Sequence, residues 1–108
     1  DKNTPLRVAV KNDYIQLVEL LIKNGADVNV KYGYFQQTPL HVAAEKNSIN
    51  LARLLIDNKA DVNAEDKDKN TPLHLAVEKN YIELVELLIK NGVEVNAKGD
   101  YDITPLHL

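Results

Sequence analysis

The residues of this chain best suited to metal chemistry are three histidines, His41, His74 and His107. A neutral imidazole nitrogen is a common zinc ligand, so a metal site is the first hypothesis to weigh. Each histidine, however, directly follows the same tripeptide, Thr-Pro-Leu, and the histidines are evenly spaced along the chain. They therefore occupy one position of a repeated unit. The chain has no cysteine, which excludes disulfides and thiolate zinc sites.

Side chains arranged for catalysis are few. Ser48 is the only serine, at an expected turn between helices. Glu83 and Glu86 lie three residues apart on one face of an expected helix, which we interpret as a solvated face. No nucleophile elbow, phosphate loop or Ser-His-Asp pattern is present. The sequence therefore predicts that the chain is not an enzyme and has no catalytic residue.

Aromatic side chains are concentrated in one short stretch, where Tyr32, Tyr34 and Phe35 are three of the six aromatic residues. Aromatic side chains bury large areas at a low entropy cost, so they are enriched at the energetic centres of protein interfaces. The alternative is that a ring folds back and packs against its neighbours. For each of these rings the sequence leaves recognition and packing open.

The candidate residues belong to a unit that recurs along the chain. Thr-Pro-Leu begins at positions 4, 38, 71 and 104, so the first interval is one residue longer than the two equal intervals after it. A Val-Asn pair starting at positions 28, 62 and 95 keeps nearly the same period, as do apolar runs at 17–22, 51–56 and 84–89. Three markers with one period identify a repeat protein. The connection 29–38 is one residue longer than 63–71 and 96–104, so the aromatic stretch lies in a connection with an insertion.

Each unit has the pattern of two short helices. Thr71 is a good N-cap, and Pro72 fits the first helical position, where no N–H is needed. Asn80 ends this helix, because asparagine tolerates the left-handed conformation. Residues 82–89 form a bulkier amphipathic helix, which Gly92 ends. Helices this short are marginal alone, so the units must stack, and the predicted fold is an all-α solenoid with projecting turn or hairpin fingers.

The repeated unit resembles the ankyrin repeat, for which a period of about 33 residues and the motif T-P-L-H-x-A are typical. The matching stretches are residues 38–43 and 71–76. The resemblance covers essentially the whole chain and predicts one array, with repeats at about 1–32, 33–65 and 66–98 and a partial fourth at 99–108. Arg7 departs from the pattern by replacing the histidine, and Lys59 by replacing the glycine after the second helix. Because both ends have the pattern of interior units, we expect a fragment of a longer array.

The resemblance implies a structural role for the histidines. Stacked helices lie roughly 10 Å apart, so one zinc ion would not bind histidines of successive units, and we predict neither a metal nor a cofactor. The net charge is −3 and the charges are mixed, which argues against nucleic-acid binding. No apolar run is long enough for membrane insertion. We expect no small-molecule substrate, and a cytoplasmic location.

The resemblance also implies that the chain binds another protein along a concave face formed by finger tips and the outward side of the first helices. Carried over to this sequence, the expected partner-binding residues are Tyr32, Tyr34, Phe35, Gln37, Glu45, Lys46, Lys67, Asp68, Asn70, Glu78, Lys79 and Tyr101, with Lys11, Asn12, Asp100 and Ile103 on the same face. The alternative is a structural or elastic spacer within a larger channel, toxin or cytoskeletal protein. The aromatic insertion favours recognition, since a spacer has no need to display these rings.

Overall fold

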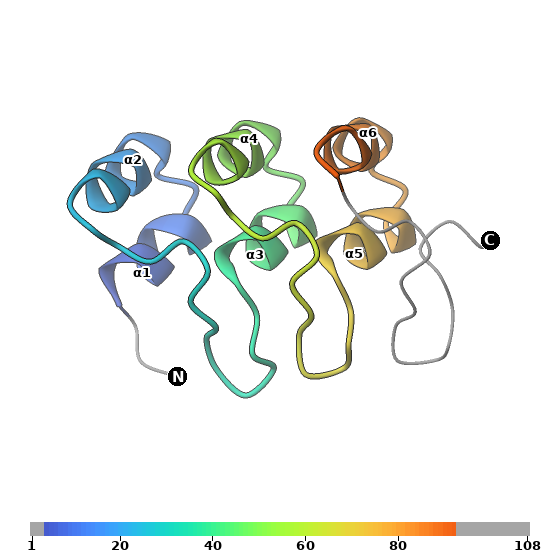
Figure 1. The fold of residues 1–108 in the computed structure, drawn as a ribbon, viewed down its shortest axis with the longest axis horizontal. Helices are drawn as coiled ribbons and strands as arrows, with labels where there is room; N and C mark the ends of the chain where they lie inside the picture. Colours follow the sequence, from blue (N-terminus) through green and yellow to red (C-terminus); the bar gives the residue numbers. More distant parts are fainter. Residues whose placement is uncertain (1–3, 93–108) are drawn as a thin grey trace.

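The computed structural model describes residues 4–92, which form six helices in three pairs (Figure 1). The first helix of each pair has seven residues: α1 (Pro5–Lys11), α3 (Pro39–Glu45) and α5 (Pro72–Glu78). The second has nine: α2 (Ile15–Lys23), α4 (Ile49–Asp57) and α6 (Ile82–Lys90). For both helices, the interval from the first pair to the second is one residue longer than the interval from the second to the third. The predicted all-α fold of repeated helix pairs is confirmed.

Each first helix begins and ends as the sequence predicts. The Thr71 hydroxyl accepts a hydrogen bond from the His74 backbone N–H at 3.3 Å, and proline follows at the first helical position. After the helix the chain turns through one left-handed residue, with φ of 59° at Asp13, 56° at Asn47 and 60° at Asn80. Aspartate and asparagine tolerate this conformation better than other residues with a Cβ, so the turn between the two helices stays short.

The second helices also end at a left-handed residue, and one of the three is not glycine. Gly25 and Gly92 have φ of 100° and 91°, and Lys59 has φ of 76° at the equivalent position. A residue with a Cβ is disfavoured there relative to glycine. The helix before Lys59 has the same length as its equivalents. We therefore expect the lysine to lower stability without changing the fold.

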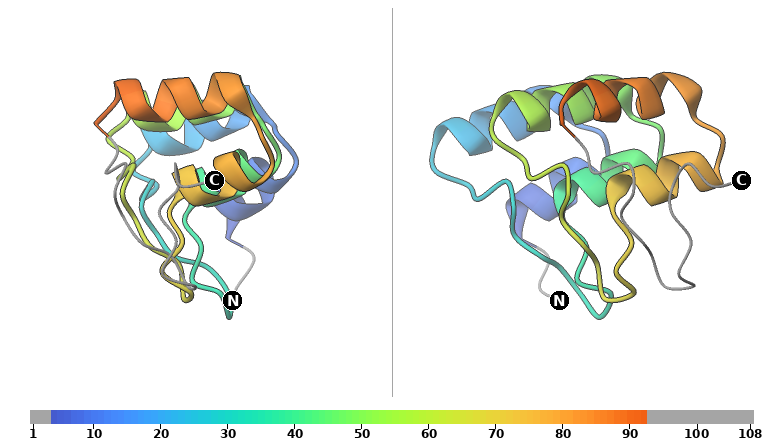
Figure 2. Two further views of the ribbon diagram at one scale, coloured as in Figure 1. Left: turned by 90° about the vertical axis from the view of Figure 1, so that its right-hand side faces the viewer. Right: turned by 45° about the vertical axis from the view of Figure 1, so that its right-hand side comes forward.

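The three pairs stack side by side in two layers, with the first helices in one layer and the second helices in the other (Figures 1 and 2). The central helix α3 contacts α1 and α5, and α4 contacts α2 and α6. The core is aliphatic, and its largest fully buried apolar side chains include Leu40, Leu51, Leu55, Leu73, Leu84 and Leu88. Contacts between adjacent pairs thus stabilise helices that are too short to be stable alone.

The place of a residue in the stack decides how buried it is. Leu17, Leu51 and Leu84 are equivalent in the repeat, yet Leu17 is 42% exposed and the other two are fully buried. Leu51 and Leu84 lie on α4 and α6, each of which contacts the second helix of the pair before it, whereas Leu17 lies on α2 in the first described pair. The same residue type therefore makes very different contributions to the core.

The connections between pairs project away from the helix layers as fingers (Figure 2). In the first finger (residues 31–37), Tyr32 and Gln37 form an antiparallel pair that encloses four residues. In the second finger (residues 65–70), the Asp66 N–H donates to the Asn70 carbonyl at 2.9 Å across three residues. The extra residue of the first interval thus lies in the turn of the first finger, and the helices keep their lengths.

Candidate partner-binding surface

The turn of the first finger is held by its own backbone. The Tyr32 N–H donates to the Gln37 carbonyl at 2.8 Å, and the Gln37 N–H donates back at 3.1 Å. Within the turn, Gly33 and Gln36 have positive φ, of 70° and 54°. The Gln36 backbone N–H and side-chain Nε2 both donate to the Gly33 carbonyl, at 3.2 and 2.8 Å. Tyr34 lies between these two residues and is carried to the tip of the finger.

Tyr34 and Phe35 form the most exposed aromatic pair among the described residues. Their side chains are 73% and 56% exposed. The two ring centroids lie 5.2 Å apart at an interplanar angle of 86°, an edge-to-face arrangement that aromatic pairs favour. The finger therefore displays apolar area to solvent in a defined geometry, as a recognition site requires.

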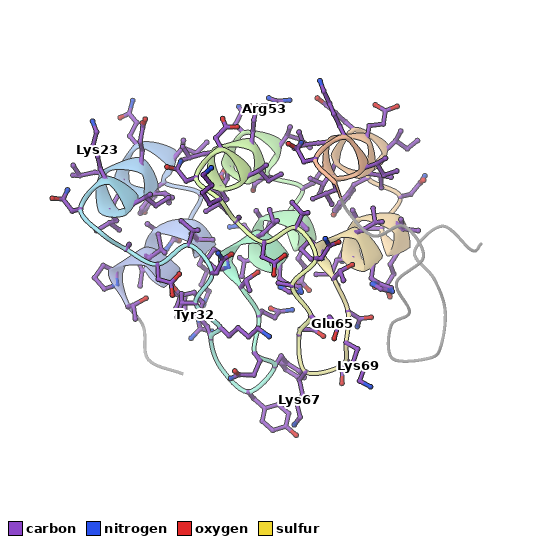
Figure 3. All side chains as sticks on the ribbon, viewed as in Figure 1. Lys23, Tyr32, Arg53, Glu65, Lys67 and Lys69 are labelled. Carbon is purple, nitrogen blue, oxygen red and sulfur yellow. The ribbon has the colours of Figure 1, made fainter. Side chains whose placement is uncertain are left out.

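Lys67 joins the tip of the second finger to this aromatic pair (Figure 3). Its backbone N–H donates to the Phe35 carbonyl at 2.8 Å, and its Nζ lies 3.2 Å from the centroid of the Tyr34 ring. An ammonium over a ring face is attracted by the ring quadrupole. In the opposite direction, Lys31 Nζ donates to the Glu65 carbonyl at 2.9 Å. Two lysines thus link the fingers reciprocally, and the aromatic tip is part of a two-finger unit.

The structure assigns Tyr32 to packing. Its side chain is only 6% exposed, its hydroxyl accepts a hydrogen bond from the Thr4 hydroxyl at 3.2 Å, and its ring lies 5.6 Å from the Arg7 guanidinium carbon. Burial raises the pKa of the Tyr32 phenol. Of the two roles that the sequence leaves open for this ring, the buried one is observed, and we exclude Tyr32 from the candidate surface.

Arg7, which contacts Tyr32, stands where the other two described units have a histidine. In the second unit His41 takes that position, and its Nδ1 accepts from the Thr38 N–H at 3.1 Å. Since Nδ1 is an acceptor, the ring proton is on Nε2, which donates to the Asn70 carbonyl at 2.8 Å. His41 is fully buried, and burial lowers the pKa of its imidazole. In the first unit, Arg7 and Tyr32 make the corresponding connection between a first helix and the finger that follows it.

The second finger is shaped mainly by one aspartate. Asp66 Oδ1 accepts from the backbone N–H groups of Asp68 and Asn70, both at 2.9 Å. Asp68 is exposed beside Lys67, while Asn70, like Gln37 in the first finger, is half-buried at the finger base. Of these three expected binding residues, Asp68 is therefore the most accessible.

The remaining expected residues lie at the far ends of the first helices. Glu45, Lys46, Glu78 and Lys79 lie where α3 and α5 end, and Lys11 and Asn12 lie where α1 ends; all six are exposed. A seven-residue helix is about 10 Å long, and the ends of the first helices lie away from the finger tips (Figure 2). The structure thus brings Tyr34, Phe35 and Lys67 together but leaves the helix-end charges apart from them.

Two of the helix ends are linked to each other. Lys46 Nζ donates a hydrogen bond to the Lys11 carbonyl, and the Tyr81 hydroxyl donates to the Glu45 carbonyl at 3.5 Å. The lysine ammonium therefore lies at the negative end of the α1 dipole, a favourable position for a cation. The expected residues Asp100, Tyr101, Ile103 and His107 lie outside the residues that the structure describes.

Neither a metal cluster nor a membrane-spanning helix is found in residues 4–92. No three histidine or acidic side chains of this region come together as metal ligands. None of the helices described is long and apolar enough to cross a bilayer.

The comparison with protein families decides the identity of the repeat. A family model described as ankyrin repeats, in three copies, matches residues 6–99. The chain belongs to the ankyrin-repeat family. Ankyrin repeats are generally protein–protein interaction modules, and the family is generally non-enzymatic. A search of curated proteins finds no match to this ankyrin chain.

Sequence reasoning missed the long-range contacts of the fingers and helix ends in this ankyrin array. The Lys67–Tyr34, Arg7–Tyr32 and Lys46–Lys11 contacts each join residues that are far apart in the sequence. The Arg7–Tyr32 contact could have been suspected from the sequence, since each of these two residues differs from the residue at its position in the other units. The others depend on how far one finger or helix end lies from the next, which the periodicity does not specify.

Proposed function

We propose that this ankyrin array binds another protein, and that Tyr34 and Phe35 are the energetic centre of the binding surface. The observation that carries the proposal is that both rings are largely exposed yet held in one arrangement by the finger turn and by Lys67. A ring that is already ordered loses little entropy when a partner covers it. Exposed and ordered aromatic area of this kind is typical of a recognition site rather than of a spacer.

The charges at the ends of α3 and α5 form the outer part of the proposed surface. Asp68 and the helix-end side chains Glu45, Lys46, Glu78 and Lys79 include both signs. Charges at the rim of an interface act mainly on the association rate and on salt dependence. We therefore expect the aromatic tip to supply most of the affinity and the helix-end charges to orient the partner as it approaches.

The proposal is tested by binding and stability measured on the same variants. Wild type and the Tyr34→Ala/Phe35→Ala double variant are used to capture partners from lysate, and the affinity for each captured partner is then measured. Loss of a central aromatic anchor costs about 2 kcal/mol or more, so each substitution should weaken binding by about thirtyfold or more. The melting temperature should stay nearly unchanged, because neither ring belongs to the core.

Tyr14→Ala is the matched control for this experiment. Tyr14 is 54% exposed and precedes α2, in the layer away from the fingers, so its loss removes exposed aromatic area without touching the aromatic tip. If the double variant keeps every partner that wild type captures, the finger is not the binding site, and the spacer alternative gains support.

A further inference from the structure

We infer that the partner of the aromatic tip presents an acidic side chain next to an apolar one. This inference rests on the proposed function and adds the chemistry of the partner. It comes from the position of the Lys67 ammonium, which lies 3.2 Å from the centroid of the Tyr34 ring while the same ring stays 73% exposed.

The Tyr34 face already has a cation bound to it. A lysine or arginine of a partner would have to displace the Lys67 ammonium and would be repelled by it. The backbone hydrogen bond from Lys67 to the Phe35 carbonyl, at 2.8 Å, keeps the Lys67 backbone beside the rings, so its ammonium competes with an incoming cation for the Tyr34 face. The tip is therefore closed to basic side chains on this face, even though an isolated tyrosine ring would attract them.

The Lys67 ammonium itself has unused capacity. Lys67 is exposed, and its interactions in the described residues are the backbone bond to Phe35 and the contact with the Tyr34 ring. Asp66, the acidic residue directly before Lys67, is engaged within its own finger, where its Oδ1 accepts hydrogen bonds from two backbone N–H groups. An ammonium has three donors, so a carboxylate of the partner can bind Lys67 while the partner's apolar atoms cover Tyr34 and Phe35.

The surrounding charges favour one carboxylate over a polyanion. Glu65 and Asp68 are exposed on the second finger, on either side of Lys67 in the sequence, and Lys69 is exposed next to them. This mixture of signs is not the basic stripe that a run of phosphates requires, whereas a single carboxylate beside an apolar side chain meets one ammonium and two rings. We therefore assign the tip to an acidic protein segment and treat nucleic acid as an outcome of the test.

The test is selection from a library of short random peptides displayed on phage, carried out on wild type and on the Tyr34→Ala/Phe35→Ala variant. Peptides that depend on the two rings should be enriched in aspartate or glutamate adjacent to a large apolar residue. A synthetic peptide from this set should bind Lys67→Gln about two- to fivefold more weakly than wild type, the range expected for an exposed charge pair. Selection on Lys67→Glu should enrich basic residues instead.

Lys23→Gln is the matched control, because it removes the same charge from the end of α2, far from the fingers (Figure 3). It should bind the synthetic peptide as wild type does. Ring-dependent peptides that are basic or uncharged would overturn the acidic assignment and leave the proposed surface intact. A wild-type selection with no ring-dependent peptide would count against both proposals. A mixed-sequence single-stranded oligonucleotide that binds wild type but not Lys67→Gln would assign the tip to nucleic acid and also overturn the inference.

Discussion

At the scale of the residue, two tyrosines that are two positions apart have opposite environments. Tyr32 is 6% exposed at the base of the first finger, and Tyr34 is 73% exposed at its tip. The backbone pair between Tyr32 and Gln37 fixes the base of the finger against the first helix pair, where Thr4 and Arg7 contact the Tyr32 side chain. At the tip, Tyr34 contacts Phe35 and Lys67, which are themselves exposed and leave its ring in solvent. The neighbours of each ring depend on the fold, so the sequence alone does not tell the two rings apart.

This difference predicts opposite effects on stability. Tyr32→Ala should lower the free energy of unfolding by about 2 kcal/mol or more, since it removes a buried ring. Tyr34→Ala should change it by no more than about 0.5 kcal/mol, as is usual for an exposed side chain. Urea unfolding of the two variants measures both values, and Tyr32→Phe reports separately on the hydrogen bond from Thr4. Equal losses in the two alanine variants would show that the finger tip also contributes to the fold.

His41 predicts a dependence of stability on pH. Burial lowers the pKa of its imidazole below 6.5, the ordinary value, so the unfolded chain binds a proton more readily than the folded one. Stability is therefore fully present above about pH 6.5 and falls as the pH drops below that value, by at most about 1.4 kcal/mol per pH unit for this group. Protonation of Nδ1 would also break the hydrogen bond that it accepts from Thr38.

The measurement compares urea midpoints of wild type and His41→Asn between about pH 7.5 and about pH 5.5, a window above the ordinary pKa of the carboxylates. His74 and the other groups are common to both proteins, so their contributions cancel. The midpoint of wild type should fall more than that of the variant. A variant with the same pH slope as wild type would exclude His41 as the source.

At the scale of the element, helix boundaries follow closely from local sequence. Thr71 and Pro72 specify the start of α5, and the left-handed Asn80 specifies its end, because capping and backbone preference act over one turn of chain. This is why the helix pairs could be predicted without a structure. In the first finger, the sequence locates the one-residue insertion but does not predict the turn, in which Gly33 and Gln36 have positive φ.

Lys59, the left-handed residue after α4, tests how the end of a helix affects stability. Because Lys59 has φ of 76° where Gly25 has 100°, Lys59→Gly should raise the free energy of unfolding by about 0.5–1 kcal/mol. The reciprocal change Gly25→Lys should lower it by a similar amount, since open space surrounds the position of its Cβ and only the backbone conformation opposes the side chain. Thermal melts of both variants check the pair. A destabilised Lys59→Gly would mean that the lysine side chain makes a favourable contact that outweighs its backbone cost.

At the scale of the whole molecule, the contribution of a residue depends on which unit covers it. The periodicity of the sequence predicts that Leu17, Leu51 and Leu84 are equivalent, and the structure agrees on their position but not on their burial. The cross-unit contact of Lys67 with Tyr34 was also beyond prediction, because it depends on the distance between neighbouring fingers. Local sequence specifies each unit, whereas the proposed binding surface depends on contacts between units.

A pair of leucines tests this dependence. Leu51→Ala should lower the free energy of unfolding by about 2–5 kcal/mol, because it opens a cavity in the closed centre of the stack. Leu17→Ala makes the same change at the equivalent position and should cost clearly less, since that side chain is 42% exposed already. Urea unfolding followed by circular dichroism compares the two. Equal losses would indicate that Leu17 is covered in solution.

The turn of the first finger has a practical consequence for protein engineering. Two repeat intervals that differ by one residue are compatible with helices of identical length, so the extra residue has been taken up between Tyr32 and Gln37 alone. A loop whose length varies without disturbing its scaffold is a natural position for grafting. Replacing residues 33–36 with a foreign epitope, and keeping Tyr32 and Gln37 to close the loop, would convert the array into a display scaffold for that epitope.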